Sequence, residues 1–233
     1  MNTAHNILKA CIRKMAQRRP FNVIVEGNIG SGKTTLLEHF KKYEDVSVQA
    51  EPLEQWTNFN GHNLLALMYK DAQKWSFSFE SYVLLTMMQQ HQHPTNRAVR
   101  LMERSLFSAK YIFVEKMHRD GNIPDASAAV LDEMFKFLNE QKPPQVDLIV
   151  YLRATPEVVH ERMVKRNRDG ENTVSLNYLQ DLHEMHEDWL VRKTLGHCPA
   201  PVLVMNADLD KAQIANEYKK YEGDILKGIR LQA

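Results

Sequence analysis

The chain has 233 residues, of which 43% are hydrophobic and 25% are charged, which is enough for one globular domain with a sizeable core. Nine glycines and nine prolines are too few for a disordered or collagen-like chain, and two cysteines cannot build a disulfide scaffold or a four-cysteine zinc site. No stretch approaches roughly 18 apolar residues, so we expect no membrane-spanning helix. The net charge of +1 gives no overall reason to expect binding to nucleic acid or to a membrane.

The first 20 residues differ in charge from the rest of the chain. They contain five basic residues, Lys9, Arg13, Lys14, Arg18 and Arg19, and no acidic residue. Apolar residues between positions 7 and 15 fall at helical spacing, as in a mitochondrial presequence, although the segment is poor in serine. Two interpretations stay open: a basic arm on a cytoplasmic protein, which we expect, or a mitochondrial targeting segment. We expect residues 21–233 to form a single domain.

Five short apolar runs predict strands, and the stretches between them predict helices. The strands are expected at residues 21–25, 46–50, 98–103, 147–152 and 201–206. The helices are expected at residues 35–43, 63–69, 78–90, about 105–118, about 125–140, 156–167 and 175–192, and at the C-terminus. Buried strands that alternate with helices indicate an α/β fold with a five-stranded parallel sheet, covered by helices on both faces.

The first turn carries the strongest chemical signal. Residues 27–34 read Gly-Asn-Ile-Gly-Ser-Gly-Lys-Thr, which fits the P-loop pattern G-x-x-x-x-G-K-[ST] between a predicted strand and a predicted helix. In such a loop the backbone N–H groups hold phosphate oxygens, Lys33 neutralises phosphate charge and Thr34 can ligate Mg²⁺. We therefore expect ATP or another nucleoside triphosphate to bind with Mg²⁺. The expected contacts are Gly27, Asn28, Ile29, Gly30, Ser31, Gly32, Lys33, Thr34 and Thr35.

The P-loop alone does not identify the phosphate acceptor. A GTPase needs Asn-Lys-x-Asp after a later strand, whereas residues 206–210 read Asn-Ala-Asp-Leu-Asp. A motor or related ATPase is usually longer and needs an apolar strand that ends in a metal-binding acid. The small size of the chain favours a metabolite kinase.

Two further predicted strands end in chemically useful residues. Ligands of a parallel sheet bind beyond the carboxyl ends of its strands, so Glu51 and Glu103 are expected at the mouth of the site. Glu51 could accept a proton from an attacking hydroxyl, and Trp56 could cover an aromatic ligand. Glu103 could hold Mg²⁺ through water, and Arg104 could hold a substrate or phosphate group. The alternatives are a capping acid for Glu51 and a surface ion pair for Glu103 and Arg104.

A cluster of cations follows the predicted helix at 156–167. Residues 161–171 read Glu-Arg-Met-Val-Lys-Arg-Asn-Arg-Asp-Gly-Glu, with Arg162, Lys165, Arg166 and Arg168 before a glycine. Guanidinium groups in a hinged loop suit a lid that closes over phosphates, because they bind oxygens in pairs. Cations are also favoured near a helix C-terminus, but this explains one or two of them rather than four.

Together these segments resemble the deoxyribonucleoside kinase family, in particular its insect multisubstrate and mitochondrial thymidine kinase branches. The resemblance runs from about residue 21 to about residue 218. The segments that carry it are residues 27–34, Glu51-Pro-Leu-Glu-Gln-Trp56, Leu67-Met-Tyr-Lys70, Ser81-Tyr-Val83, Leu85-Thr-Met87, Glu103-Arg-Ser105 and the arginine cluster. The resemblance implies transfer of the γ-phosphoryl group of ATP to the 5′-hydroxyl of a deoxyribonucleoside. It also implies a homodimer formed through helices and feedback inhibition by a deoxynucleoside triphosphate.

The resemblance further implies a role for individual residues. Glu51 would be the general base, with Arg104 beside it, and Tyr69 and Glu171 would hold the 3′-hydroxyl. The residues implied around the base are the sandwiching rings of Trp56, Phe79 and Phe113 and the far wall of Val83, Met87 and Ala109. The implied lid cations are Arg162, Arg166 and Arg168.

Two positions depart from the family pattern. Glu80 stands where the family has a base-reading Gln, and Val164 stands where the nearest branch has another lid arginine. An ionised Glu80 offers acceptors only, which suits the two donors of guanine and predicts a lean toward purines within a broad substrate range. Alternatively, burial between Phe79 and Phe113 would raise the pKa of Glu80 and keep it protonated, which would restore pairing like that of Gln.

Two other functions share part of this pattern. A nucleoside monophosphate kinase has a P-loop and an arginine lid, but it needs cations for the acceptor phosphate, which Glu171 would repel. A non-catalytic ATP-binding module would not need Glu51 at the end of its strand.

Overall fold

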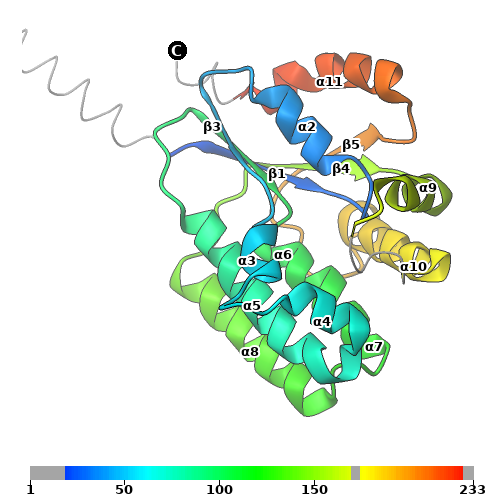
Figure 1. The fold of residues 1–233 in the computed structure, drawn as a ribbon. Coiled ribbons are helices and arrows are strands. Elements are labelled where there is room, and N and C mark those ends of the chain that lie inside the picture. Colours follow the sequence, from blue (N-terminus) through cyan, green and yellow to red (C-terminus); the bar gives the residue numbers. More distant parts are fainter. Residues whose placement is uncertain (1–18, 169–173, 228–233) are drawn as a thin grey trace, which may run out of the picture.

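The computed structural model describes residues 19–168 and 174–227 (Figure 1). Its strands are β1 (Phe21–Glu26), β2 (Val46–Gln49), β3 (Val99–Glu103), β4 (Leu148–Arg153) and β5 (Val202–Asn206). All paired neighbours run parallel, in the spatial order β2-β3-β1-β4-β5. The predicted five-stranded parallel sheet is confirmed, and every predicted strand boundary lies within one residue of the observed one.

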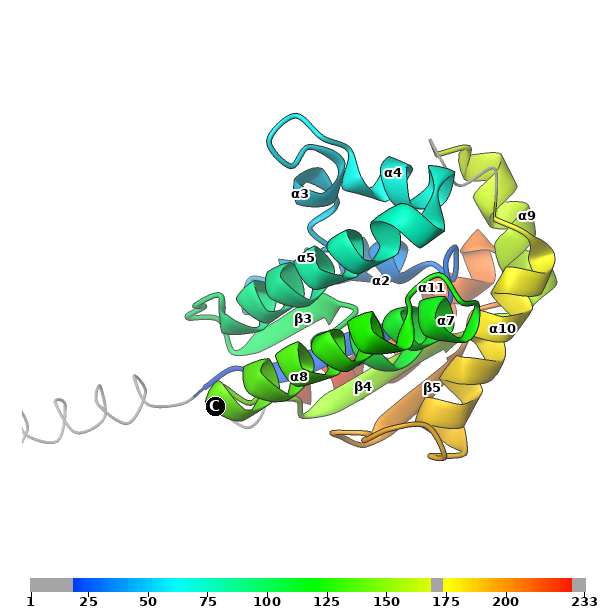
Figure 2. The ribbon, with the colours of Figure 1, turned by 90° about the horizontal axis from the view of Figure 1, so that it is seen from below.

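Helices cover both faces of the sheet, as expected for buried parallel strands. Val23 and Val25 of β1 pack on the face covered by α2 (Lys33–Phe40), α9 (Pro156–Arg166) and α11 (Lys211–Ile225). Ile24 points the other way, into a core with α5 (Ala72–Gln92) and α8 (Asp125–Gln141). Figure 2 shows α5 and α8 lying side by side in front of the sheet, with α10 (Leu176–His186) next to α9.

The region after β2 contains more helix than the sequence analysis predicted. The short helix α3 (Leu53–Thr57) was not predicted, and α5 begins at Ala72 rather than at residue 78. The Asp71 carboxylate caps α5 by accepting a hydrogen bond from the Lys74 N–H at 3.2 Å. Asn63 caps α4 (Leu64–Lys70) in the same way, through the Ala66 N–H at 2.9 Å. In Figure 1 these helices and α3 lie together below the sheet.

Two of the predicted helices contain a wider turn. The segment predicted at 105–118 consists of α6 (Leu106–Ser108), the π-helical turn η1 (Ala109–Val114) and α7 (Glu115–Arg119). The segment predicted at 175–192 consists of α10 and the π-helical turn η3 (Glu187–Val191). Such turns are rare and frequently lie at functional sites. Here η1 supplies two residues, Ala109 and Phe113, to a cavity that is also lined by the P-loop.

Candidate active site

The P-loop between β1 and α2 has a backbone that requires glycine. Gly27 and Gly30 have φ angles of +143° and +78°, and a Cβ on Gly30 would lie 2.8 Å from the Val159 carbonyl oxygen. Asn28 anchors the loop, since its side-chain amide donates to the Leu179 carbonyl at 2.8 Å. The loop is therefore held open between β1, α9 and α10, with the N-terminus of α2 behind it.

Lys33 lies inside this loop. Its ammonium donates to the carbonyl oxygens of Gly27 at 3.2 Å and Asn28 at 2.9 Å. Burial, and then the positive charge of Arg104, lower the pKa of Lys33 to about 8. An anionic phosphate at this place would raise that pKa again, because it would compensate for the buried charge.

The next residue, Thr34, contacts the end of β3. Its hydroxyl lies 3.1 Å from both carboxylate oxygens of Glu103. Burial and the neighbouring charge of Glu51 raise the pKa of Glu103. A hydroxyl and a carboxylate at the P-loop are hard oxygen donors, which fits Mg²⁺ bound together with phosphate oxygens. Among the described residues, no group of three or more His, Cys, Asp and Glu side chains could form an all-protein metal cage.

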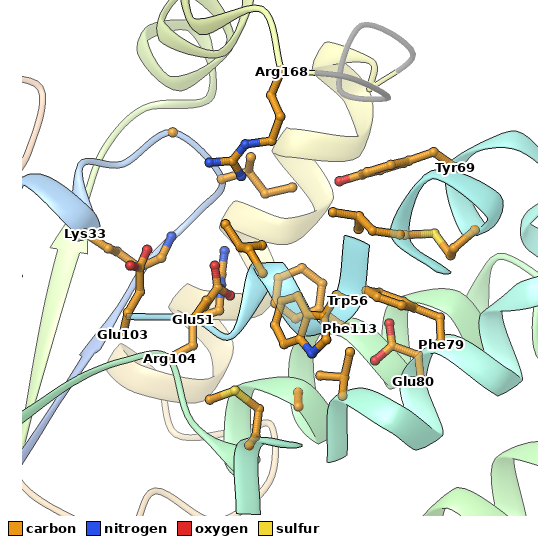
Figure 3. A pocket seen from close by; sticks show the side chains of 18 of the residues that line it. Lys33, Glu51, Trp56, Tyr69, Phe79, Glu80, Glu103, Arg104, Phe113 and Arg168 are labelled. Carbon is orange, nitrogen blue, oxygen red and sulfur yellow. The ribbon is translucent and has the colours of Figure 1, made fainter. Parts of the chain in front are cut away.

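Arg104 follows Glu103 and bends the chain sharply. Its φ angle is +61°, a left-handed conformation that costs a non-glycine residue about 1–2 kcal/mol. Its guanidinium Nε lies 2.8 Å from Oε1 of Glu51, and its Cζ lies 4.6 Å from the centroid of the Phe113 ring. Lys33, Glu51, Glu103 and Arg104 thus meet at the carboxyl edge of the sheet (Figure 3).

A cavity opens from these charged residues toward α4, α5 and η1, and we call it the aromatic cavity (Figure 3). Trp56 and Phe79 lie edge to face within it, with ring centroids 5.8 Å apart at 84°. The Trp56 indole N–H donates to the Thr86 hydroxyl at 2.9 Å, which fixes the indole plane. The rings therefore present a slot that suits a planar heterocycle. The other predicted pocket residues that line the aromatic cavity are Tyr69, Glu80, Val83, Met87, Ala109 and Phe113.

Glu80 is an unusual group for this apolar environment. Its side chain is 2% exposed, and its Oε2 has no hydrogen-bond partner in the structure. Burial raises the pKa of Glu80 to about 8. Glu80 is therefore mostly protonated at neutral pH, and its carboxylic acid then carries one donor and one acceptor, as a Gln amide does. Of the two alternatives for Glu80, the structure favours the protonated one.

A second cavity lies on the other side of the P-loop, and we call it the basic cavity. It is lined by residues of the P-loop, α2, α9, the loop between β5 and α11, and α11 itself, including Thr35, Lys165, Leu209 and Tyr218. Lys33, Thr34, Glu103 and Arg166 line both cavities. The two cavities therefore meet at the P-loop lysine.

The three predicted lid arginines do not all line the same cavity. Arg166 and Arg168 line the aromatic cavity, and Arg168 points down into it from the end of α9 (Figure 3). Arg162 lines only the basic cavity, and its guanidinium donates to the carbonyl oxygens of Ala207 at 2.7 Å and Leu209 at 2.9 Å. Arg162 thus fastens α9 to the loop after β5. Val164 is 62% exposed on the same helix.

The structure brings almost all of the predicted site residues together. Glu171 lies outside the described residues. Sequence reasoning missed other residues of the aromatic cavity, namely Leu53, Leu65, Met68, Ser105, Met117 and Tyr178. Met117 and Tyr178 lie in predicted helices, and no local pattern in the sequence marks which face of these helices meets the cavity. No helix in the described part of the chain is long and apolar enough to cross a membrane.

The comparisons with known proteins all indicate one enzyme family. A family model described as deoxynucleoside kinase matches residues 23–229. Human mitochondrial thymidine kinase 2 is 48% identical over 186 residues, which cover 80% of this chain and 70% of that protein. A probable deoxycytidine kinase of fowlpox virus is 37% identical over 190 residues, 81% and 79% of the two chains. The mitochondrial deoxyguanosine kinase of Xenopus laevis is 32% identical over 214 residues, 80% and 81% of the two chains.

Proposed function

The chain belongs to the deoxynucleoside kinase family and phosphorylates deoxynucleosides with ATP as donor, and from this premise we propose how its own residues carry out the reaction. The observation that carries the proposal is the wall shared by the two cavities, which contains Lys33, Thr34, Glu103 and Arg166. The deoxynucleoside occupies the aromatic cavity and ATP occupies the basic cavity. The γ-phosphate then lies at the P-loop, between donor and acceptor.

Glu51 acts on the acceptor. The base enters the slot between Trp56, Phe79 and Phe113, and this places the 5′-hydroxyl at the charged end of the aromatic cavity. Glu51 accepts the hydroxyl proton as the 5′-oxygen bonds to the γ-phosphorus and the bond to the β,γ-bridging oxygen breaks. The products are a deoxynucleoside 5′-monophosphate and ADP. Arg104 holds the Glu51 carboxylate through the 2.8 Å ion pair.

Cations from the P-loop and from α9 act on the transferring group. Lys33, Arg166 and Arg168 neutralise the charge on the phosphoryl oxygens as they pass between the cavities. Thr34 and Glu103 would hold Mg²⁺, whose charge helps to stabilise the phosphates when it is bound. Tyr69 and Glu171 hold the 3′-hydroxyl. Arg162 orders the loop that borders the ATP site.

Glu80 sets the base preference. As a neutral carboxylic acid it can donate to O4 of thymine or N3 of cytosine and also pair with adenine, so the substrate range covers all four deoxynucleosides. Ionised Glu80 instead suits the N1–H and N2–H donors of guanine. The lean toward purines therefore becomes a lean toward deoxyguanosine as the pH rises toward and above about 8, the pKa of Glu80.

A kinetic assay with three conditions tests the reaction itself. ATP is supplied with thymidine, with thymidine monophosphate or with no acceptor, and the formation of ADP and of phosphorylated products is followed. Thymidine should give thymidine monophosphate. Faster phosphorylation of thymidine monophosphate would instead indicate a nucleoside monophosphate kinase, and ADP formation that ignores the acceptor would indicate an ATPase.

The enzyme is a homodimer that pairs through α5 and α8. Leu85 of α5 is 44% exposed, and Val130 and Phe137 of α8 are 49% and 61% exposed. Leu85 and Phe137 border one apolar groove between the two helices, together with Tyr82 and Met134. A second copy of the chain would bury this surface, since stable homodimer interfaces are more apolar than the rest of a protein surface.

A deoxynucleoside triphosphate inhibits the enzyme by occupying both cavities. Its base would take the aromatic slot, and its phosphates would reach Lys33 and Arg166 in the shared wall. Such an inhibitor should compete with both the deoxynucleoside and ATP. Competition with only one of the two would contradict this mode of inhibition.

Residues 21–233 form one domain, and residues 1–20 act as a mitochondrial targeting arm rather than as part of a cytoplasmic protein. The basic composition of the arm and the similarity to human mitochondrial thymidine kinase 2 support this location. Residues 1–20 fused to a fluorescent protein should direct it to mitochondria, and a fusion with the five basic residues changed to glutamine should not. A cytoplasmic distribution of the first fusion would overturn the proposal.

A further inference from the structure

Glu26 is a buried carboxylate at the last position of β1, directly before the P-loop. Its side chain is 0% exposed. Oε1 accepts a hydrogen bond from the Ser105 hydroxyl at 2.6 Å, whereas Oε2 has no hydrogen-bond partner among the described residues. Burial raises the pKa of Glu26 to about 7, although the nearby Arg104 charge and the Ser105 hydroxyl oppose the rise. Burying a carboxylate costs free energy, so we expect Glu26 to have a role in the site that offsets this cost.

The contact links Glu26 to the left-handed turn at Arg104. The Arg104 N–H donates to the carbonyl of Val25 at 2.9 Å, and the Ser105 hydroxyl donates to Glu26. Val25 and Glu26, the last two residues of β1, therefore hold Arg104 and Ser105, the two residues directly after β3. Ser105 is further fixed because it caps α6 in a reciprocal arrangement with Ser108.

This turn determines where the Arg104 side chain lies. Successive side chains of a strand point to opposite faces, so a continued β3 would separate Arg104 from Glu103. With φ at +61°, Glu103 reaches Thr34 while Arg104 reaches Glu51 (Figure 3). A left-handed conformation of a non-glycine residue persists only where its surroundings enforce it.

We propose that Glu26 is a positioning residue for phosphoryl transfer: through the Ser105 hydroxyl it holds the turn that aims the Arg104 guanidinium at Glu51. The proposal rests on the role of Arg104 in the proposed function. A carboxylate suits the task because a hydrogen bond between a hydroxyl and a carboxylate is shorter and stronger than one between neutral groups. The carboxamide of a glutamine would still accept the Ser105 hydrogen bond.

A double-mutant cycle between Glu26 and Arg104 tests the proposal. kcat and both KM values are measured for Glu26→Ala, Arg104→Ala and the double variant, with the melting temperature of each protein. Glu26→Ala should lower kcat roughly 10- to 100-fold, as expected for a misplaced catalytic group, and change both KM values much less. In the Arg104→Ala background the same change should lower kcat less than about twofold, because the residue that Glu26 positions is already absent.

Three further variants complete the design. Glu26→Gln should keep most of the activity, since it keeps the acceptor for Ser105. Ser105→Ala removes the same hydrogen bond from its donor side and should reproduce the coupling to Arg104, so it replaces Glu26→Ala if that protein does not fold. Glu187→Ala removes another buried carboxylate, one bound by Tyr151 and Arg153, and its effect should be independent of Arg104.

One set of results would contradict the positioning role of Glu26, and a different result would contradict the proposed function of Arg104. An equal loss of kcat on Glu26→Ala with and without Arg104 would overturn the positioning role, and so would a Glu26→Gln variant as impaired as Glu26→Ala. An unchanged kcat in Arg104→Ala alone would show instead that the proposed function of Arg104 is wrong.

Discussion

Arg104 and Glu51 form an ion pair at the junction of the two cavities, with Nε 2.8 Å from Oε1 and with side chains that are only 7% and 14% exposed. The same guanidinium lies over the Phe113 ring at 4.6 Å. One arginine therefore links the carboxylate that would accept the proton to a ring that would cover the base. Because both contacts are largely buried, loss of one partner would leave the other charge uncompensated.

The first prediction concerns the separation of the two cavities. Lys33→Ala should abolish turnover, because Lys33 faces the donor phosphates, while the deoxynucleoside should still bind. Isothermal titration of the variant with a deoxynucleoside measures this directly, and Lys41→Ala, at an exposed position just after α2, is the control. Loss of deoxynucleoside affinity would mean that the two sites are not separable.

The second prediction concerns the effect of Glu80 on stability. Burial raises the pKa of Glu80 from its ordinary value of 4.5 to about 8 in the folded protein. Between these two values the unfolded state loses its proton first, so the wild type should become less stable as the pH rises from 4.5 to 8. Each unit of this raised pKa corresponds to about 1.4 kcal/mol, so the total loss is at most about 5 kcal/mol.

Glu80→Gln should not lose stability in this way as the pH rises, because the glutamine amide does not ionise. Melting temperatures of both proteins between pH 5 and pH 8.5 give the comparison. The melting temperature of Glu80→Gln should increase relative to that of the wild type as the pH rises. Parallel curves would show that Glu80 is not held in an apolar environment.

The third prediction concerns base preference. Glu80→Gln should raise the ratio of kcat/KM for pyrimidine deoxynucleosides to that for deoxyguanosine several-fold at pH 9 and much less at pH 7, because only ionised Glu80 disfavours pyrimidines and Glu80 is mostly protonated at pH 7. An unsatisfied buried polar group costs about 1–3 kcal/mol, which sets the upper range of the effect. The four natural deoxynucleosides are compared at both pH values. If the ratio did not change, the volume of the aromatic cavity alone would set the preference.

The main elements of the fold could be predicted from the sequence because each buried strand is a short apolar run between polar turns. The P-loop was equally clear, since its glycines and lysine occur at fixed spacing. The short helix α3 has no such pattern: its five residues are held in place by the packing of Trp56. The early start of α5 depended on the Asp71 cap, a local signal that the sequence does contain.

The site was harder to predict than the fold. The spacing of residues identified Glu51, Glu103 and Arg104 at strand ends, but the resemblance to a family was needed for Tyr69 and Phe79. Which face of a helix meets a cavity depends on tertiary packing, and for this reason Met117 and Tyr178 were missed. The π-helical turn η1 could not be predicted either, because no local sequence signal marks such a turn. Arg162 contacts backbone carbonyls that only the folded chain brings near it.

The fourth prediction concerns the oligomeric state. Phe137→Asp places a charge on the apolar groove between α5 and α8 and should convert the homodimer into a monomer in sedimentation velocity. Val164→Asp is the matched control, because Val164 is equally exposed on α9, outside the groove. A dimer that persists in Phe137→Asp would mean that the chains do not associate through this surface.

The general base is the centre of the account, and Glu51→Gln tests it most directly. The measurement is the pair of kcat and the deoxynucleoside Kd for this variant, with Glu54→Gln, an exposed acid in α3, as the control. The account predicts that Glu51→Gln lowers kcat by roughly 10²–10⁴ while the Kd changes little, because the carboxamide cannot accept the 5′-hydroxyl proton. A fall in kcat of less than about tenfold, well below the range of a positioned base, would contradict it and leave Glu51 as a capping acid.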